Sequence, residues 1–246
     1  GIVDEVKIWN YALSENEIVE EFERFEEEEE ELIPNSLVAH YTFNEGTGTT
    51  ITDSAGENHG TIIGATWVDD SISGKAIQVG ESGYIRIKET QSTDISRTDA
   101  YTISGWFKLN TGDATGNSFF WSDYTWNKSG YLSIVFSRDQ KFYYYNTHKD
   151  SQGNQFKIMK INMFTEDFTD KWHHLVQQAY IVNGKTIIKI YVDGVLKGSS
   201  EFENTEGFVN EPNNLKLAVD LDGIVDEVKI WNYALSENEI NQEFER

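Results

Sequence analysis

The chain has 246 residues, of which 38% are hydrophobic, and carries a formal net charge of -22. This acidity argues against a nucleic-acid partner, because phosphate binding needs a basic face. The chain contains no cysteine, which excludes disulfides, thiolate metal sites and cysteine catalysis. It also contains no apolar run near the ~18 residues that a membrane span needs, so we expect no membrane insertion.

The chain opens with a segment that occurs twice. Its first 18 residues, GIVDEVKIWNYALSENEI, recur unchanged as residues 223–240. The match continues to the arginines at 24 and 246 and fails at two positions only, where Val19 and Glu20 correspond to Asn241 and Gln242. An offset of 222 residues indicates one full repeat preceded by the tail of another.

Each copy predicts a strand followed by a capped helix. Val228 and Ile230 share one face of the expected strand, and Trp231 belongs to the opposite face. Ser236 and Glu239 have the spacing of a capping box, in which the serine caps the N3 amide and the glutamate reaches back to the cap. Ser14 and Glu17 repeat this pattern in the first copy.

An acidic stretch separates the first copy from the rest of the chain. Residues 1–31 hold 13 Asp or Glu against two basic residues, a net charge of -11, and end in the six consecutive glutamates of residues 26–31. Such a run is typical of a solvated spacer, and Pro34 marks a boundary. We therefore expect residues 1–31 to be the terminal strand and acidic helical linker of a preceding repeat, and residues 32–246 to form one domain. The chain is then an excerpt of a longer protein.

Short strands and turns alternate through the rest of the chain. YTISGWFKL, residues 101–109, alternates with a period of two, which places Tyr101, Ile103 and Phe107 on one face. Asn183-Gly184 and Asp193-Gly194 are favoured hairpin dipeptides between strand-forming runs. This pattern predicts an all-β jelly-roll sandwich of two antiparallel sheets, with a short acidic helix or linker on the N-terminal side and a short C-terminal helix.

Five segments resemble, in their order, the LamG-like jelly-roll family within the concanavalin A-like lectin and glucanase superfamily. They are LVAHYTFNEGTGTTITDSAGENHGT, SGKAIQVGESGYIRI, YTISGWFKL, KWHHLVQQAYIVNGKTIIKIYVDGVLKG and GIVDEVKIWNYALSENEI, and they cover about residues 36–240. The resemblance implies a sandwich of two antiparallel sheets, often used in tandem on secreted or surface proteins.

The same resemblance implies a calcium ion held by an aspartate of the D-S-x-G-x-N turn and one of the terminal strand. These residues are Asp53 and Asp226, and the turn can supply further oxygens from Gly56, Asn58 and the main chain of His59. Acidity favours such sites by concentrating cations, although it also simply aids solubility. The alternative is that Asp53 makes an Asx turn and Asp226 a strand-end hydrogen bond.

A dense aromatic stretch is a second candidate site. Its rings offer stacking platforms for sugars, with polar side chains beside them for the hydroxyl groups. The residues we assign to this carbohydrate site are Trp121, Asp123, Tyr124, Trp126 and Asn127. The alternative is that these aromatics belong to the core, as large aromatics mostly do.

The sequence gives little support to catalysis. Glycosidases need two carboxylates that face one cleft, and no credible core strand carries such a pair. Glu201 and Glu203 have a suitable spacing but are expected near a sheet edge, and His173 and His174 are expected to have a structural role. We therefore predict that the chain is not an enzyme.

The first copy of the repeated strand has no sheet of its own. Its apolar residues are Ile2, Val3, Val6, Ile8 and Trp9. Three interpretations of this strand remain open: it is the end of an upstream domain, a strand that adds to another molecule, or a strand that exchanges with the identical C-terminal copy.

These observations favour a non-catalytic adhesion or structural repeat module, stabilised by calcium, in a tandem surface or filament protein. Its partners are then neighbouring repeats or copies of itself. The alternative is a carbohydrate-binding module of a larger surface protein or enzyme, with glycans as partners. Both hypotheses place the protein outside the cell or on its surface.

Overall fold

The computed structural model describes residues 8–15, 17–18, 36–88, 90–94, 98–110, 118–123, 132–136, 142–149, 155–161, 169–203 and 215–246. For Glu81, for the strands between residues 118 and 161, and for residues 202–203 it describes the backbone alone. The chain divides into two compact units, Gly1–Pro34 and Asn35–Arg246. The assignment of the first unit to a preceding repeat stays a prediction.

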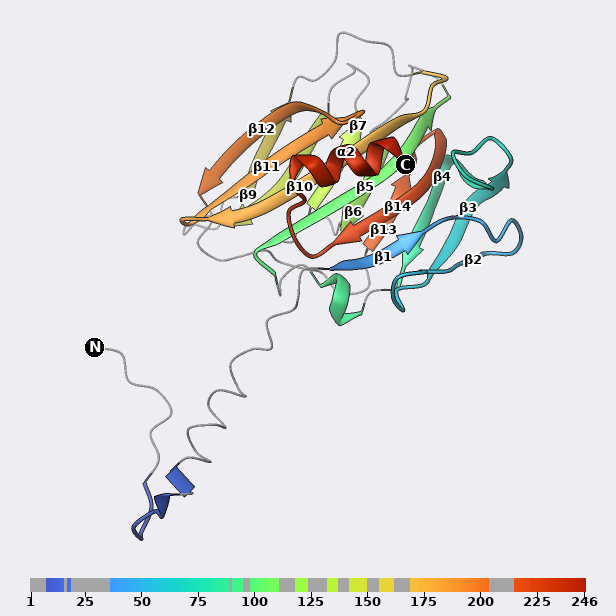
Figure 1. Ribbon diagram of the computed structural model, residues 1–246. Helices are drawn as coiled ribbons and strands as arrows, with labels where there is room; N and C mark the ends of the chain where they lie inside the picture. Colours follow the sequence, from blue (N-terminus) through green and yellow to red (C-terminus); the bar gives the residue numbers. More distant parts are fainter. Residues whose placement is uncertain are drawn as a thin grey trace. The chain divides into compact units, whose positions relative to one another are not determined.

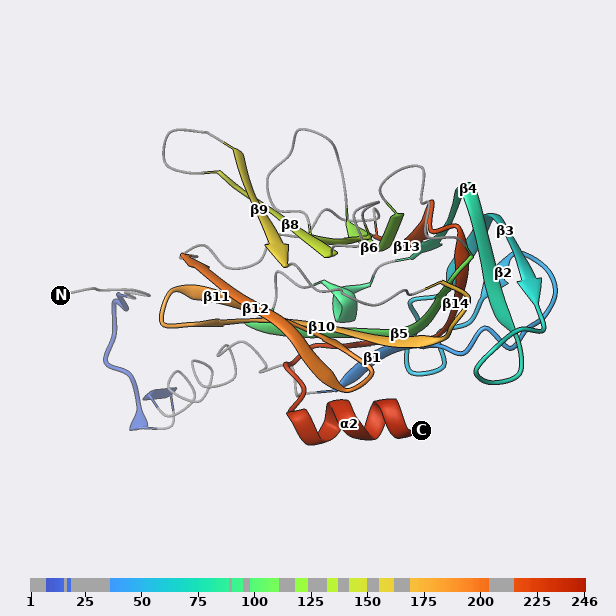
Figure 2. The ribbon, with the colours of Figure 1, turned by 90° about the horizontal axis from the view of Figure 1, so that it is seen from above.

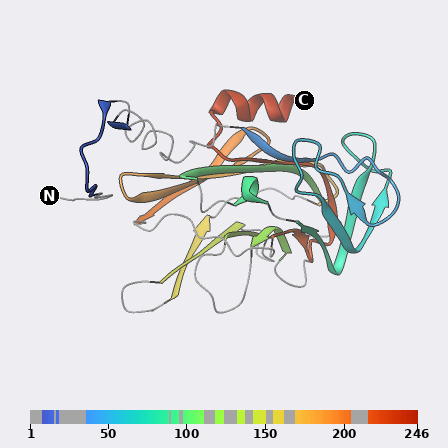
Figure 3. The ribbon, with the colours of Figure 1, turned by 90° about the horizontal axis from the view of Figure 1, so that it is seen from below.

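The second unit is a sandwich of two layers of antiparallel strands with one helix outside it (Figure 2, Figure 3). One layer has the order β12-β11-β10-β5-β14, with β1 beside β14, and the other has the order β13-β6-β7-β8-β9. The strands of the first layer are β12 (Val195–Glu203), β11 (Lys185–Val192), β10 (His173–Val182), β5 (Ala100–Leu109), β14 (Gly223–Trp231) and β1 (Leu37–Tyr41). Those of the second are β13 (Leu215–Val219), β6 (Ser118–Asp123), β7 (Leu132–Phe136), β8 (Phe142–Lys149) and β9 (Gln155–Ile161).

One long strand joins the two layers at their edge (Figure 1). β4 (Ala76–Ile87) pairs with β14 through its first half and with β13 through its second half. Its pairing with the neighbouring strand shifts register between Ile63 and Ala65, and a side chain at Gly83 would come within 2.7 Å of the Gly64 carbonyl there. β3 (Gly60–Val68) and the short β2 (Thr50–Ile51) extend this edge. The predicted jelly-roll sandwich is confirmed, with its two layers joined into one hydrogen-bonded sheet.

The predicted turns and alternation are also confirmed. Asn183 and Asp193 have φ of 51° at the tips of the β10–β11 and β11–β12 hairpins, each followed by a glycine of positive φ, as a type I′ turn requires. In β5, Tyr101, Ile103 and Phe107 are buried in the core between the layers. Burial of this alternating face fixes the register of β5 between its neighbours β10 and β14.

The C-terminal helix α2 (Glu237–Glu245) lies on the outer face of the first layer (Figure 2). Ser236 caps it, and Glu239 completes the predicted capping box. Ile240 packs beneath it in a second apolar cluster with Val176, Tyr191, Trp231 and Leu235. The two faces of β14 therefore pack in different places. Val228 and Ile230 lie in the main core, and Trp231 lies in the cluster under α2.

In the first unit, the structure describes the end of the repeated segment. Ser14 and Glu17 form the same capping contacts as their counterparts in α2, and the Ile18 amide donates to the Ser14 carbonyl at 3.0 Å. The expected acidic continuation after Ile18 lies outside the described residues. In the described parts of the chain, no helix is long and apolar enough to cross a membrane.

Candidate functional site

A β-bulge in β14 places Asp226 and Glu227 at the candidate site. The pairing of β14 with β5 shifts register between Asp226 and Lys229, and Glu227 has a φ of 49°, which is uncommon for a residue other than glycine. Bulges redirect side chains and strained residues concentrate at functional sites. The bulge turns the acidic pair of the repeated segment toward two different partners.

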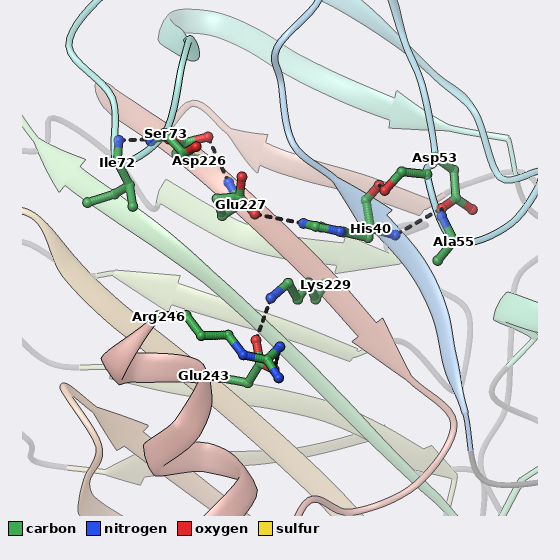
Figure 4. Close-up of polar contacts among 11 residues, drawn as sticks. His40, Asp53, Ala55, Ile72, Ser73, Asp226, Glu227, Lys229, Glu243 and Arg246 are labelled. Atoms are coloured by element: carbon green, nitrogen blue, oxygen red, sulfur yellow. Dashed lines mark hydrogen bonds and ion pairs between the residues drawn. The ribbon is translucent and has the colours of Figure 1, made fainter.

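Asp226 is fully buried, and its carboxylate accepts hydrogen bonds from backbone N–H groups of a neighbouring loop. Its Oδ2 accepts from Ile72 at 2.8 Å and from Ser73 at 3.0 Å, and its Oδ1 accepts from Glu227 at 2.8 Å (Figure 4). Burial raises the pKa of Asp226 to about 6, because the three hydrogen bonds offset only part of the loss of solvation. Asp226 thus fastens the loop at residues 72–73 to β14.

Glu227 points to the other side of the strand and contacts β1. Its Oε2 lies 2.7 Å from His40 Nε2, and both side chains are largely buried. The backbone N–H of His40 in turn donates to Asp53 Oδ1 at 2.9 Å (Figure 4). His40 therefore links the β14 bulge to the turn that contains Asp53.

Asp53 is buried and its carboxylate faces four N–H donors. Oδ1 accepts from His40 and Ala55 at 2.9 Å, and Oδ2 accepts from the amide and the side chain of Asn58 at 3.1 and 2.9 Å. Burial opposes ionisation, but these hydrogen bonds outweigh it and hold the pKa of Asp53 below its usual value. The bond from Ala55 is the Asx turn that the sequence offered as the alternative to a metal.

Asn58 is fully buried and ties three segments together. Its Nδ2 donates to the Val38 carbonyl at 3.0 Å, and its Oδ1 accepts from the hydroxyls of Thr90 and Thr93 at 2.7 and 3.1 Å. Thr90 caps the short 3-10 helix η1 (Gln91–Thr93). These threonines were not recognisable from the sequence, because no motif connects Thr90 with a turn more than thirty residues earlier.

The predicted calcium ligands do not converge on one point. Figure 4 shows Asp53 and Asp226 on the two sides of the Glu227–His40 pair. The described residues contain no group of three or more His, Cys, Asp or Glu that could hold a metal. His59 is exposed and accepts the Asp53 amide at its Nδ1, and Gly56 is exposed in the same turn. N–H donors face the carboxylate oxygens that a cation would need, so the residues present do not fit the expected calcium ion.

Two polar pockets flank the contact between α2 and β14. Lys229 forms an ion pair with Glu243 of α2, and both pockets include these residues and Arg246. The first, of about 290 Å³, is lined by Ile72, Ser73, Ser104, Trp106, His174, Glu227, Lys229, Glu243 and Arg246. The second, of about 330 Å³, is lined by Leu37, His40, Lys229, Trp231, Tyr233, Leu235, Glu239, Gln242, Glu243 and Arg246. Their size suits water or a small polar ligand.

Two buried polar groups line the first pocket. Among the described residues, neither the Ser104 hydroxyl nor Nδ1 of His174 has a hydrogen-bond partner. The His174 ring stacks with Phe244 and contacts Trp106 at a tilt, and burial lowers the pKa of the ring to about 4, so the ring is neutral at physiological pH. His173 bonds to Asp193 at 2.7 Å through Nδ1. These contacts agree with the structural role expected for both histidines.

The structure locates part of the predicted carbohydrate site. Trp121 and Asp123 belong to β6, where they lie opposite Leu217 and Leu215 of β13. Tyr124, Trp126 and Asn127 lie outside the described residues. Of the predicted assembly strand, Ile8 and Trp9 are described and exposed, whereas Ile2, Val3 and Val6 lie outside the described residues.

The carboxylates considered for catalysis lie at a sheet edge. Glu201 and Glu203 belong to β12, the last strand of its layer, as the sequence predicts. Glu201 is exposed and pairs with Lys185 at 2.8 Å. A carboxylate held by a surface lysine has neither the burial nor the partner of a glycosidase acid.

The chain matches a known protein family in sequence and solved structures in fold. A family model described as the concanavalin A-like lectin/glucanases superfamily matches residues 79–241. In sequence, no curated protein matches the chain. Domain 4 of AbnA, an extracellular arabinanase from Geobacillus stearothermophilus solved with arabinotriose, is 23% identical with a TM-score of 0.59, over 85% of this chain and 98% of that domain.

Two toxin binding domains have the same fold. The binding domain of botulinum neurotoxin serotype D is 13% identical with a TM-score of 0.65, and this chain covers 50% of it. A structure of botulinum neurotoxin type C, whose cell entry depends on interaction with two ganglioside molecules, is 16% identical with a TM-score of 0.65, and this chain covers 51% of it. In both comparisons 85% of this chain is matched, so the chain spans about half the length of these toxin domains. At such identities the likeness establishes the fold.

Proposed function

Because the chain belongs to the concanavalin A-like lectin/glucanases superfamily, we propose that it is a non-catalytic module that binds carbohydrate. The observation that carries this proposal is the match to a separate domain of an arabinanase, solved with arabinotriose, of which this chain covers 98%. Because nearly the whole of that domain is matched, the comparison supports the interpretation of this chain as a separate binding domain of similar size. It also reverses the order of the two hypotheses that the sequence favours, and places the carbohydrate-binding module first.

The aromatic segment that begins with β6 is the proposed binding surface. Sugar rings bind aromatic faces, and Tyr124 and Trp126 are close in sequence to Asn127, whose amide suits the hydroxyl groups. Trp121 and Asp123 lie opposite the buried Leu217 and Leu215, and residues opposite one another share a face of the sheet, so these two positions are on the core face and the alternative of a core role is favoured for them. In the second layer, β6 lies between β13, which is the first strand of the layer, and β7. β6 belongs to the second layer, whereas β14 belongs to the first.

The surroundings of the two carboxylates weighed for catalysis, Glu201 and Glu203, support a binding role over hydrolysis. The edge position and the surface ion pair of Glu201 leave it without the environment that raises the pKa of a catalytic acid. The module therefore holds a polysaccharide or glycan without cleaving it. The arabinanase that contains the matched domain is extracellular by its description, which supports an extracellular location for this chain as well.

A repeat module for adhesion is the second candidate, and a specific observation favours it. Residues 1–18 repeat the closing strand and helix cap of this domain without a change. A second domain of the same design would use this segment as its own last strand. A tandem array of binding modules on a surface protein combines both candidates, because multivalency raises avidity.

A glycan array tests the proposal directly. The full chain is expected to bind at least one polysaccharide or glycan, and Trp126→Ala is expected to weaken binding by about tenfold or more, since the loss of ~1.4 kcal/mol from one stacking contact has that effect. Trp9→Ala, in the separate N-terminal unit, is the matched control and retains binding. Absence of binding to every glycan, together with filaments or oligomers in solution, would instead support the structural repeat.

A further inference from the structure

The two copies of the repeated segment have the same capping-box contacts. In the first copy, the Ser14 amide and hydroxyl donate to Glu17 at 2.8 and 2.7 Å. In the second copy, the Ser236 amide and hydroxyl donate to Glu239 at 2.7 and 2.6 Å. The preceding tyrosine bonds to the other oxygen of the same glutamate in both copies, at 3.3 and 2.9 Å. The described part of the first copy is therefore preorganised like the element that closes the domain.

Their surroundings differ completely. Ile230 and Ile240 are 2% and 0% exposed, because they pack into the main core and into the cluster beneath α2. Their counterparts Ile8 and Ile18 are 93% and 54% exposed. The first copy thus presents to solvent the same apolar side chains that the second copy buries.

The structure shows what these side chains fit. We define the closing site as the surface that β14 and α2 cover, formed by the edges of β1, β4 and β5 and by the outer face of β10 and β11. β14 pairs with β1, β4 and β5, Val176 and Tyr191 receive Trp231 and Ile240, and the hydroxyl of Thr102 donates to the carbonyl of Tyr233. Each of these contacts uses a residue that the two copies share.

We propose that residues 1–24 are a second closing element, which competes with residues 223–246 of the same chain for the closing site. The two copies differ only at Asn241 and Gln242, which are both exposed in α2, so the apolar side chains and the cap that hold this element in the site are the same in both. With the first copy in place, residues 1–222 contain every strand of the domain in a circularly permuted order. Surface-located termini make such permutations tolerable. The proposal is independent of carbohydrate binding.

The chain is long enough for the first copy to reach the closing site, but the connection to β13 favours the C-terminal copy. Residues 25–36 can extend over about 40 Å, whereas α2 is only about 14 Å long. The C-terminal copy follows β13 after residues 220–222, so its effective concentration at the closing site is the higher of the two. The observed arrangement, with the C-terminal copy in the site, is therefore the major state, and the exchanged arrangement is the minor one.

Thermal unfolding of four full-length chains tests the competition. Trp231→Asp with Ile240→Asp disables the second copy, and Trp9→Asp with Ile18→Asp disables the first. Disabling the first copy alone leaves the melting temperature unchanged. Disabling the second alone leaves a cooperative transition at a lower temperature, and disabling both removes it. If the chain with the second copy disabled unfolds like the chain with both disabled, the first copy does not enter the site and the proposal is wrong.

A disulfide trap gives an answer that does not depend on these substitutions. The chain has no cysteine, and His40 pairs in register with Lys229, whose counterpart in the first copy is Lys7. Lys7→Cys with His40→Cys is expected to accumulate an intramolecular disulfide under mild oxidation. Glu15→Cys with His40→Cys is the control, because the counterpart Glu237 lies in α2 and has no pairing with β1. No cross-link above the control, or cross-linked dimers in place of monomers, would overturn exchange within one chain.

Discussion

Asp226 combines burial with an acidic neighbour, and its protonation is the most sensitive chemical property of the β14 bulge. Because folding raises its pKa to about 6, the protonated form stabilises the fold at low pH and this contribution is lost as the pH rises through 6. D226N cannot ionise. Relative to D226N, the native chain is expected to lose about 2 kcal/mol of unfolding free energy between pH 4 and pH 7. Denaturation at four pH values in the presence of a chelator measures this difference, and a difference independent of pH contradicts the assignment.

Calcium binding at Asp53 and Asp226 can be tested through the melting temperature. An ion present at a hundred times its dissociation constant raises the free energy of unfolding by about 2.7 kcal/mol, which corresponds to several degrees in melting temperature. From the N–H groups that face Asp53 and Asp226, we expect chelated protein to show no shift when millimolar calcium is added. A saturable rise in melting temperature, absent from D226N, would show that these hydrogen bonds give way to an ion.

Single residues mark the limit of what the sequence predicts. The Asx turn at Asp53 was recognisable as an alternative, since aspartate before glycine and asparagine favours that turn. The Asn58 contacts to Thr90 and Thr93 and the Glu227–His40 pair were not recognisable, because they join segments that are distant in sequence. The bulge that aims Glu227 at His40 has no local signature either, since glutamate rarely adopts a positive φ.

At the scale of elements, the repeated strand and helix provide an internal control. Ser236→Ala removes the cap of α2, which packs against the domain, and is expected to lower the free energy of unfolding by about 1 kcal/mol. Ser14→Ala removes the same cap from the exposed copy and is expected to leave the domain's unfolding unchanged. Urea denaturation compares the two variants. Equal losses would mean that the first copy contributes to the stability of the observed fold.

Elements with local signatures were predictable. The capping box located α2, the Asn-Gly and Asp-Gly dipeptides located two hairpins, and alternation identified the buried face of β5. The joining of both layers by β4 was not predictable, because it depends on two halves of one strand choosing different partners. Such pairing is a property of tertiary packing rather than of strand propensity.

At the scale of the whole molecule, the order of five weak motifs predicted a fold that no single motif could. Function is harder, because it depends on side chains at a surface rather than on the pattern of the core. Half of the net charge of -22 lies within residues 1–31, outside the domain that the family model matches. The net charge of the chain is therefore a poor guide to the charge of its binding surface.

We propose that this domain binds carbohydrate at the aromatic segment without cleaving it. Isothermal titration of the best oligosaccharide from the array, with product analysis afterwards, tests both parts. We predict binding to the native chain and to Trp9→Ala with equal dissociation constants, about tenfold or weaker binding to Trp126→Ala, and intact oligosaccharide at the end. Unchanged affinity in Trp126→Ala, or hydrolysed oligosaccharide, would contradict the claim.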